Sequence, residues 1–300
     1  MKNGLDDLAC SLKRSLPKSF YRPYVRHQYK RYFGVYPDLD DPKKYSEKIQ
    51  WVKLYGNTPL KTKLADKLAV RDWIRERIGE EYLVPIVGGP WKSAKEIGFD
   101  SLPERYVLKT NHGSGSVIVV DGRKPLDRKE AVKKLDRWLH TNYAFYSFEL
   151  QYRDIEPFAY AEEYLEDEVL AELPDYKFFC FDGHVYCCYL IFGRRSHDEK
   201  SRRGFLDRDF KVLPFQRKGY HPLGEDVERP ENYDEMVKLA EKLSEGFSHV
   251  RVDLYSVKGK IYFGEMTFTG SSGFWRLEPE DYDRVLGDQW DLHTEQRMPL

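Results

Sequence analysis

The chain has 300 residues, a length that predicts about two domains. Hydrophobic residues make up 41% of the sequence and aromatic residues 15%, which excludes an intrinsically disordered protein. The 49 basic and 50 acidic residues give a net charge of −1, which argues against a globally basic nucleic-acid-binding protein.

Two features predict a protein that stays in the cytoplasm. The longest apolar run, Val185 to Phe192, is much shorter than the roughly 20 residues of a membrane-spanning helix, and the N-terminus lacks the apolar core of a signal peptide. The 4 cysteines show no C-x-x-C spacing, which disfavours a disulfide scaffold or a structural zinc site. We therefore expect them to be buried, small apolar side chains: Cys10, Cys180, Cys187 and Cys188.

Residues 11–35 are rich in basic and aromatic side chains and contain no acidic residue. Such a segment can bind an anionic partner, for example a membrane surface or a phosphorylated, lipid-linked substrate. The alternative, which we favour, is a surface helix whose aromatic side chains pack on the body of the protein while its cations face water. Residues 1–60 are accordingly expected to form a helical N-terminal region.

Helices and strands alternate in residues 61–160. Apolar residues at helical spacing predict a helix over 62–78 with Gly79 as its C-terminal cap, and a Pro- and Gly-rich connector follows at 85–90. Strands are predicted at 105–109 and 116–120, and a helix at 128–141 that begins with a capping box of Asp127 and Glu130.

Residues 161–300 are richer in strands. Asp182-Gly183 is the signal of a two-residue hairpin turn. A helix at 233–245 is expected to begin with Asn232 as its N-cap. Residues 193–232 show little periodicity, and irregular segments of that length are uncommon unless they are functional. The predicted strands are 159–165, 176–181, 184–192, 248–255 and 260–268.

The first chemical motif is a loop that follows Lys109, with the sequence Thr-Asn-His-Gly-Ser-Gly and Gly115 at its end. Glycines let backbone N–H groups approach phosphate oxygens closely, and the lysine adds a positive charge. The pattern differs from the G-x-x-x-x-G-K-[ST] phosphate loop, because the lysine comes before the glycines. Taken alone, it is equally typical of an ordinary Gly-Ser hairpin.

The second motif is a pair of carboxylates on neighbouring strands. If Lys258-Gly259-Lys260 is a three-residue turn, counting outward places Asp253 opposite Glu265. Directly opposed carboxylates repel, which makes sense if a divalent cation lies between them. A register that differs by one residue would instead leave both in water.

The third motif is Glu162-Glu163-Tyr164-Leu165 at the end of a predicted strand, with Asp175 and Lys177 in the next strand. This motif is consistent with a solvated strand edge. It is equally consistent with a linker whose backbone recognises a flat base.

Together these motifs resemble the ATP-grasp superfamily, and more narrowly its teichuronopeptide-biosynthesis (TupA-like) branch. The resemblance extends from about residue 32 to residue 292. It implies an α+β protein with the ATP-grasp fold, in which a nucleotide is held between a small subdomain (61–160) and a large subdomain (161–300). The stretches that carry it are 45–51, 65–71, 106–115, 264–268, 272–274 and 286–288.

The resemblance also implies roles for individual residues, with ATP and Mg²⁺ as cofactors. Lys109, Lys177 and Arg251 would be catalytic, and Arg251 would stabilise charge on an acyl phosphate. Asp253 and Glu265 would hold magnesium, with Thr267 as a weaker ligand where many relatives have Asn. His112 would orient the phosphate loop rather than act as a base. The full nucleotide-binding set would be Lys67, Lys109, His112, Ser114, Gly115, Glu162, Glu163, Tyr164, Leu165, Asp175 and Lys177.

The implied activity is an ATP-dependent carboxylate–amine ligase of bacterial surface polysaccharide synthesis. Its partners would be a uronic-acid-containing sugar or nucleotide sugar and a small amine, amino acid or amino alcohol. Arginine forks and backbone N–H groups suit anionic acceptors, so the substrate residues would be Arg194, Arg195, Arg202, Arg203, Thr269, Ser271 and Ser272. The competing interpretations are an ATP-grasp phosphotransferase and a non-catalytic nucleotide-binding module.

Overall fold

The computed structural model describes residues 4–166, 173–193, 201–224 and 227–299. The chain forms two compact units, each assembled from three separate stretches. Unit 1 consists of Met1–Tyr21, Asn57–Trp73 and Val84–Leu165. Unit 2 consists of Arg22–Gly56, Ile74–Leu83 and Glu166–Leu300. The N-terminal residues are thus divided between the two units.

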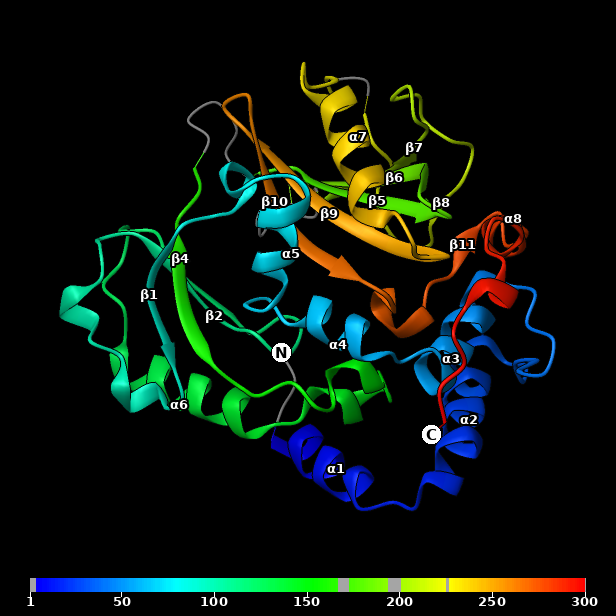
Figure 1. The fold of residues 1–300 in the computed structure, drawn as a ribbon, viewed down its shortest axis with the longest axis horizontal. Coiled ribbons are helices and arrows are strands. Elements are labelled where there is room, and N and C mark those ends of the chain that lie inside the picture. The colour runs from blue at the N-terminus through cyan, green and yellow to red at the C-terminus, as the bar shows by residue number, and fades with distance from the viewer. Residues whose placement is uncertain (1–3, 167–172, 194–200, 225–226, 300) are drawn as a thin grey trace. The chain divides into compact units, whose positions relative to one another are not determined.

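Unit 1 contains a four-stranded antiparallel sheet with the strand order β1-β4-β2-β3 (Figure 1). The strands are β1 (Ile86–Trp91), β2 (Tyr106–Thr110), β3 (Val117–Val120) and β4 (Ala159–Glu163). Helix α6 (Arg128–His140) packs on the sheet, because its buried Leu135 joins Leu108 in one apolar cluster. The Asp127 carboxylate accepts a hydrogen bond from the backbone N–H of Glu130, as the sequence predicted for the start of this helix.

The prediction of a connector at 85–90 is wrong, because most of these residues form strand β1. Pairing with β4 outweighs the local turn signal, and two register shifts between the strands absorb the glycines. The single helix predicted over 62–78 is also wrong. The structure has α4 (Pro59–Ala65) and α5 (Val70–Arg77), separated at Asp66, whose carboxylate accepts the N–H groups of Leu68 and Ala69.

Unit 1 is completed by α1 (Gly4–Arg14) and by short 3₁₀ helices. The Lys13 amine at the end of α1 donates to the carbonyl of Tyr146, at 2.9 Å, and so ties α1 to the segment after α6. The 3₁₀ helices are η1 (Lys18–Phe20), η3 (Ala94–Glu96), η4 (Phe99–Ser101), η5 (Tyr143–Tyr146) and η6 (Leu150–Tyr152).

Unit 2 contains a five-stranded antiparallel sheet with the order β10-β9-β5-β6-β7 (Figure 1). The strands are β5 (Asp175–Phe181), β6 (His184–Phe192), β7 (Arg202–Leu206), β9 (His249–Val257) and β10 (Lys260–Thr267). Strands β8 (Gln216–Arg217) and β11 (Leu277–Glu278) form a separate pair. Strand β7 lies within residues 193–232, which the sequence predicted to be irregular.

Helices surround this second sheet, and the core between them is rich in aromatic side chains. Tyr45, Phe179, Trp275 and Trp290 share one buried cluster, which explains the high aromatic content. The α-helices are α2 (Tyr21–Phe33), α3 (Tyr45–Tyr55), α7 (Tyr233–Ser244) and α8 (Tyr282–Asp288). The 3₁₀ helices are η2 (Glu80–Tyr82), η7 (Gly270–Gly273) and η8 (Leu292–Thr294). Helix α2 begins at Tyr21, which is the last residue of unit 1's first stretch.

Both predicted hairpins of unit 2 form. Asp182 and Gly183 have φ of 46° and 79°, as expected for a two-residue turn between β5 and β6. The turn between β9 and β10 also has two residues, Lys258 and Gly259, with φ of 50° and 78°. The three-residue loop predicted there is therefore wrong.

Helix α7 begins at Tyr233, but the predicted cap is wrong. The Asn232 side chain makes no cap hydrogen bond to the helix. It donates to the carbonyl of Gly259 and accepts from the hydroxyl of Ser256, and so holds the hairpin that follows. This partner lies far along the chain, beyond the reach of a local capping pattern.

Two of the six aromatic side chains in residues 11–35, Tyr21 and Tyr29, are packed inside, while Phe20 and Tyr32 are exposed. Tyr21 contacts Phe148, and the Tyr29 hydroxyl bonds that of Ser46 at 2.9 Å. Both tyrosines are buried, which agrees with the favoured alternative of aromatics packed on the body.

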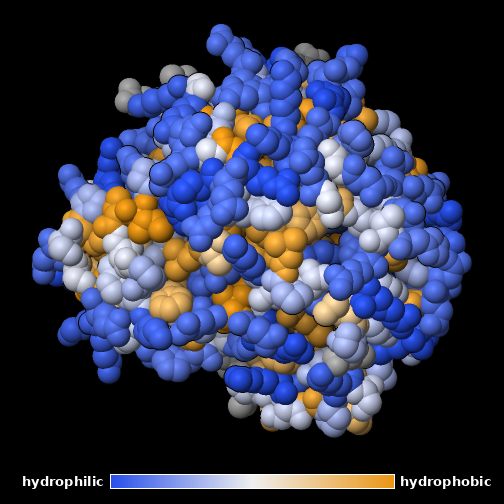
Figure 2. All heavy atoms as spheres, viewed as in Figure 1, coloured by the Kyte–Doolittle hydropathy of each residue, from blue (hydrophilic) through white to orange (hydrophobic). Residues whose placement is uncertain are grey.

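Figure 2 shows hydrophilic residues over most of one face, with smaller hydrophobic areas between them. The four cysteines are buried and form no disulfide in the described structure, as predicted. Among the residues with described placement, no helix has the length and apolar character needed to cross a membrane.

The β9–β10 turn generates a stability prediction. Lys258 has a left-handed backbone conformation that asparagine adopts more readily. We expect Lys258→Asn to raise the free energy of unfolding by about 0.5–1 kcal/mol, measured by urea denaturation. Lys260→Asn removes the same charge at the first residue of β10, outside the turn, and serves as the control. Equal stability of the two variants would contradict the turn assignment.

Candidate active site

In unit 1 the glycine-containing loop after β2 is anchored by Asn111. This fully buried amide donates to the Asp66 carboxylate and to the Glu156 carbonyl, both at 2.9 Å, and accepts from the N–H of Phe158 at 2.7 Å. The N–H of Lys67 also donates to the Asn111 carbonyl. The loop is thereby joined to the segment before α5, and Lys67 lies next to the loop.

The predicted basic residues of unit 1 already have partners in this structure. The Lys67 amine donates to the Gly113 carbonyl. The Lys109 amine pairs with the Glu162 carboxylate, and Arg71 lies 3.8 Å from the same carboxylate. The Glu162 carboxylate is thus shared by two cations, Lys109 and Arg71.

The other predicted base-reading residues lie around the end of β4. Glu163 is exposed, and its N–H donates to the Pro85 carbonyl. Tyr164 and Leu165 follow as the last, half-buried residues of unit 1. They lie outside the strand, whereas the sequence predicted that it would run to Leu165.

His112 connects the loop to the C-terminal end of α6. Its Nε2 lies 3.0 Å from the Trp138 carbonyl oxygen and 3.3 Å from that of Thr141, so Nε2 carries the proton. Burial lowers the pKa of His112 below its ordinary value, which favours the neutral ring at pH 7. The geometry fits the predicted loop-orienting role.

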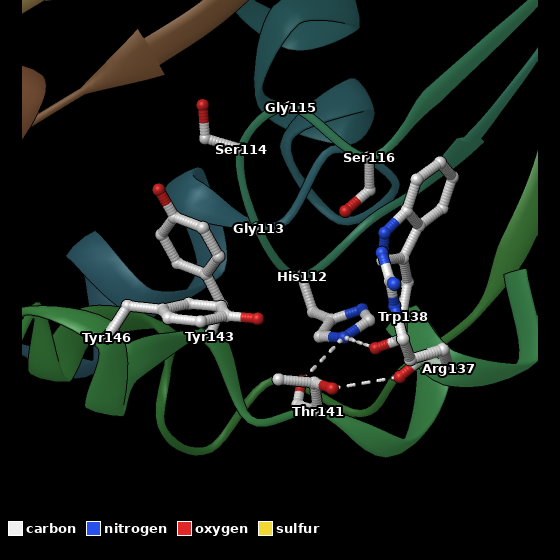
Figure 3. Close-up of a pocket in the computed structure, with 10 residues that line it drawn as sticks. All are labelled: His112, Gly113, Ser114, Gly115, Ser116, Arg137, Trp138, Thr141, Tyr143 and Tyr146. Atoms are coloured by element: carbon white, nitrogen blue, oxygen red, sulfur yellow. Dashed lines mark hydrogen bonds between the residues drawn. The ribbon is translucent and has the colours of Figure 1, made fainter. Parts of the chain in front are cut away.

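A cavity of about 290 Å³ lies between this loop and the end of α6 (Figure 3). Figure 3 shows Arg137 and Trp138 on one side of His112, and Tyr143 and Tyr146 on the other. Gly113 packs directly on the Tyr143 ring, since a Cβ at that position would lie 2.8 Å from Cδ2 of the tyrosine. Arg137, Trp138, Tyr143 and Tyr146 were not predicted from the sequence, because no local pattern marks the last turn of a helix or a following 3₁₀ helix as the wall of a site.

In unit 2 the predicted pairing of Asp253 with Glu265 is observed. The two-residue turn alone would have placed Glu265 opposite Val252, on the other face of the sheet. A β-bulge at Gly264 adds one residue to β10 and restores the pairing. A side chain at position 264 would lie 3.0 Å from the Asp253 carbonyl oxygen, so the bulge suits glycine.

The Asp253 carboxylate lies at the centre of a buried charge cluster. Arg251 donates to both its oxygens, from Nε at 2.6 Å and from Nη2 at 2.8 Å. Nη2 also lies 3.1 Å from the Glu265 carboxylate and 3.1 Å from the Thr267 hydroxyl. The Lys177 amine bonds Asp253 and lies 2.8 Å from Asp175. Six of the predicted residues, Asp175 among them, therefore meet on one face of the sheet.

Burial and charge oppose each other in this cluster. Burial raises the pKa of Asp253, while Arg251 and Lys177 lower it; burial dominates. Burial lowers the pKa of Arg251, but the negative charges of Asp253 and Glu265 raise this pKa by more, so it lies above its ordinary value. Lys177 likewise has a raised pKa, because Asp253 and Asp175 outweigh burial. Both cations therefore stay protonated at neutral pH.

The donor set of this cluster fits magnesium. Asp175, Asp253 and Glu265 carry three negative charges against two positive ones, which leaves a net charge of −1 beside carboxylate oxygens. Within the described residues, no group of three or more His, Cys, Asp or Glu side chains is placed to hold a metal ion. Magnesium, however, commonly uses one or two protein carboxylates and completes its shell with water and substrate phosphates. Asp253 and Glu265 would hold it.

The predicted substrate residues lie in different places. Arg202 and Arg203 are on β7, where their guanidinium groups lie over the rings of Phe192 at 5.1 Å and Tyr220 at 3.9 Å. Arg194 and Arg195 lie outside the described residues. The role of Arg202 and Arg203 in binding an anionic acceptor stays a prediction.

The turn after β10 contains the remaining predicted substrate residues. Thr269 and Ser272 are buried, whereas Ser271 is exposed. Ser271 and Ser272 both have left-handed backbone conformations, with φ of 49° and 55°. Such strain persists only where the surroundings enforce it, and here the Gln50 amide donates to the Ser272 carbonyl at 2.8 Å.

The comparison with protein families identifies the class of this chain. A family model described as TupA-like ATPgrasp matches residues 47–291. The chain has helices with antiparallel sheets and a helical N-terminal segment, and its fold is the ATP-grasp fold. Because the match covers most of the sequence, the chain belongs to the TupA-like ATP-grasp family, which confirms the predicted resemblance.

Several solved structures share low sequence identity with the chain. L-amino acid ligase from Bacillus licheniformis is 14% identical, with a TM-score of 0.48, over 95% of this chain and 63% of that one. D-alanine–D-alanine ligase from Bacillus anthracis is 15% identical, with a TM-score of 0.42, over 75% and 66%.

N5-carboxyaminoimidazole synthetase from Staphylococcus aureus is 11% identical, with a TM-score of 0.38, over 68% of this chain and 44% of that one. The chain thus spans less than half of this synthetase and slightly less than two thirds of the two ligases. No match was found among curated proteins.

The charge cluster predicts unequal effects of Asp253 and Glu265 on stability. Asp253→Asn leaves Arg251 and Lys177 buried without their shared counter-charge, so we expect a loss of about 3–5 kcal/mol in the free energy of unfolding. The Glu265 side chain is 30% exposed, and Glu265→Gln should cost at most about 1 kcal/mol. Urea denaturation checks both values. An Asp253→Asn variant as stable as Glu265→Gln would rule out the central role of Asp253.

Proposed function

We propose that this protein is an ATP-dependent carboxylate–amine ligase that acts through an acyl-phosphate intermediate. The acceptor is a uronic acid, as sugar or nucleotide sugar, and the amine comes from an amino acid or amino alcohol, in the cytoplasmic synthesis of a bacterial surface polysaccharide. The observation that carries the proposal is the buried cluster of Arg251, Asp253 and Glu265 with Lys177. The family membership supports the same chemistry.

Each unit contributes one group of residues in this proposal. In unit 1, Lys67 and Lys109 contact the phosphates, the Ser114-Gly115 tip covers them, and the end of β4 reads the base. In unit 2, Asp253 and Glu265 hold magnesium, with Thr267 behind them. Bound magnesium would neutralise charge on the phosphates of ATP. Neutralisation and positioning suffice, because phosphoryl transfer asks little covalent chemistry of the protein.

The reaction begins with attack of the acceptor carboxylate on the γ-phosphorus of ATP. ADP leaves, and the carboxylate becomes an acyl phosphate with a good leaving group. The amine then attacks the carbonyl carbon, and phosphate leaves as the amide forms. Arg251 is suited to stabilise the developing negative charge, because its guanidinium is permanently charged and held by Asp253 and Glu265.

A hydroxylamine trap tests the reaction class. The protein is incubated with Mg²⁺-ATP, hydroxylamine and a panel of uronic acids and their nucleotide-sugar forms. We expect a hydroxamate and ADP in equal amounts with at least one acceptor, because an acyl phosphate reacts readily with this amine. ADP and a stable phosphorylated sugar without hydroxamate would favour the alternative, a phosphotransferase. ATP binding without turnover of any acceptor would favour a binding module.

The metal assignment is tested on Glu265, because a substitution at Asp253 would also destabilise the fold. We expect Glu265→Gln to lower the rate of ADP formation by about 10²–10³-fold, because a charged ligand of the magnesium that would neutralise the phosphates is lost. Glu278→Gln is the matched control, because Glu278 pairs with Lys218 on the separate β8–β11 pair. A Glu265→Gln variant that keeps full turnover at limiting magnesium would refute the assignment.

A further inference from the structure

The cavity beside the glycine-containing loop has walls that the proposed nucleotide chemistry does not use, namely Arg137, Trp138, Tyr143 and Tyr146. It is bounded entirely by unit 1: residues 112–116 of the loop, the last turn of α6 and η5. Its volume of about 290 Å³ is at the lower edge of the range for small-molecule sites. That space suits one substituted ring and is too small for a whole nucleotide.

The charge of the lining residues argues against a polyphosphate. Of the ten described residues that line the cavity, Arg137 is the single permanent cation. His112 is held neutral by burial, which lowers its pKa. The nearby Lys67 amine bonds the Gly113 carbonyl. One guanidinium matches one carboxylate, whereas a triphosphate carries several charges that would need several cations.

The aromatic side chains argue for a ring. Trp138 lies on one side of the cavity, and Tyr143 and Tyr146 lie on the other (Figure 3). Flat aromatic faces offer apolar contact area, while the tyrosine hydroxyls and the Trp N–H offer hydrogen bonds at the rim. A hydroxylated ring has this same mixture of C–H faces and polar edges.

His112 supplies a specific hydrogen-bond acceptor at this site. Because Nε2 carries the proton and donates to the end of α6, Nδ1 bears a lone pair. Nδ1 is buried and has no hydrogen-bond partner in the structure, and the His112 side chain lines the cavity at only 4% exposure. Such a buried acceptor calls for a donor, and a ligand hydroxyl provides one.

The walls are held in place before any ligand binds. The Lys13 amine fixes the Tyr146 carbonyl, and the Gly113 backbone packs against the Tyr143 ring. The Thr141 hydroxyl donates to the Arg137 carbonyl at 2.8 Å and secures the last turn of α6. Preorganised walls reduce the ordering cost of binding a small ligand.

We propose that this cavity binds the sugar ring of the carboxylate acceptor, with the rings of Tyr143, Tyr146 and Trp138 around it. Arg137 pairs with the acceptor's carboxylate or orients it, and His112 Nδ1 accepts a hydrogen bond from a ring hydroxyl. The identity of the ring as a uronic acid rests on the proposed function; the location of the site rests on the cavity. The phosphate loop then forms one wall of the acceptor site as well as the cover of the phosphates.

The test measures binding of D-glucuronate and D-galacturonate by calorimetry and ligand-observed NMR, with and without Mg²⁺ and a non-hydrolysable ATP analogue. D-glucose is the neutral probe of the same ring size, and adenosine is the probe for a base site. We expect saturable binding of at least one uronate and at least tenfold weaker binding of glucose. Uronate binding that is absent, or no tighter than that of glucose or adenosine, overturns the proposal.

Arg137→Gln tests the residue that gives the site its charge. We expect at least a tenfold weaker affinity for the uronate, an unchanged affinity for Mg²⁺-ATP, and partial rescue in Arg137→Lys. Arg128→Gln is the matched control, because it removes the same charge from the exposed first turn of the same helix. Tyr143→Phe keeps the ring against Gly113 and removes one hydroxyl, which gives a second variant that should fold normally.

The hydroxylamine assay separates failure of this inference from failure of the proposed function. If Arg137→Gln forms uronate hydroxamate with an unchanged KM, the ligase proposal stands and the cavity site is refuted. If the uronate binds the cavity but is never activated by ATP, the ligase proposal fails and the binding site stands. A rise in KM with little change in kcat supports both proposals.

Discussion

The requirement that dominates unit 2 is neutralisation of the Asp253 carboxylate, which is 1% exposed. The neutralising charges come from two rows of side chains that run across the strands. Lys177, Asp253 and Glu265 lie opposite one another across β5, β9 and β10, and Arg251 and Thr267 occupy the next row on the same face. A slip of one residue in any of these strands would turn its charged side chains to the other face. The charge cluster therefore fixes the register of the strands that carry it.

Gly264 shows how far the sequence alone could specify this site. The pairing of Asp253 with Glu265 was predicted correctly, but from a turn that is one residue too long. The prediction also left out the bulge at Gly264. Because the bulge adds one residue to β10, it offset the error of one residue in the turn. The alternation of the strands and the presence of a turn are local signals that the sequence displays. The exact turn length and the bulge depend on packing of β10 against Asp253 and Tyr255, which no local pattern reports.

The other errors have the same origin. Residues 86–91 contain Pro and Gly but form β1, because β4 offers a partner strand. The Asn232 side chain does not cap α7, because it donates a hydrogen bond to Gly259 in the turn after β9. Asp66, read as part of a helix, breaks it and is bonded by Asn111. In each case a contact distant in sequence outweighs the local preference. The cavity wall of Arg137 to Tyr146 escaped prediction for this reason too, since only the fold brings the end of α6 to the phosphate loop.

The observed contacts also distinguish the lysines by how readily each can reach a ligand. Lys67 donates to a neutral carbonyl, and a hydrogen bond of a charged group contributes about 1.5–3 kcal/mol, which a phosphate oxygen can replace. Lys177 lies buried between Asp175 and Asp253, and breaking such a pair costs about 3–5 kcal/mol. Exchanging the partner of Lys67 therefore costs less than exchanging the partners of Lys177. In the proposed reaction this difference suits Lys67 to contact a phosphate and Lys177 to hold the carboxylates in position.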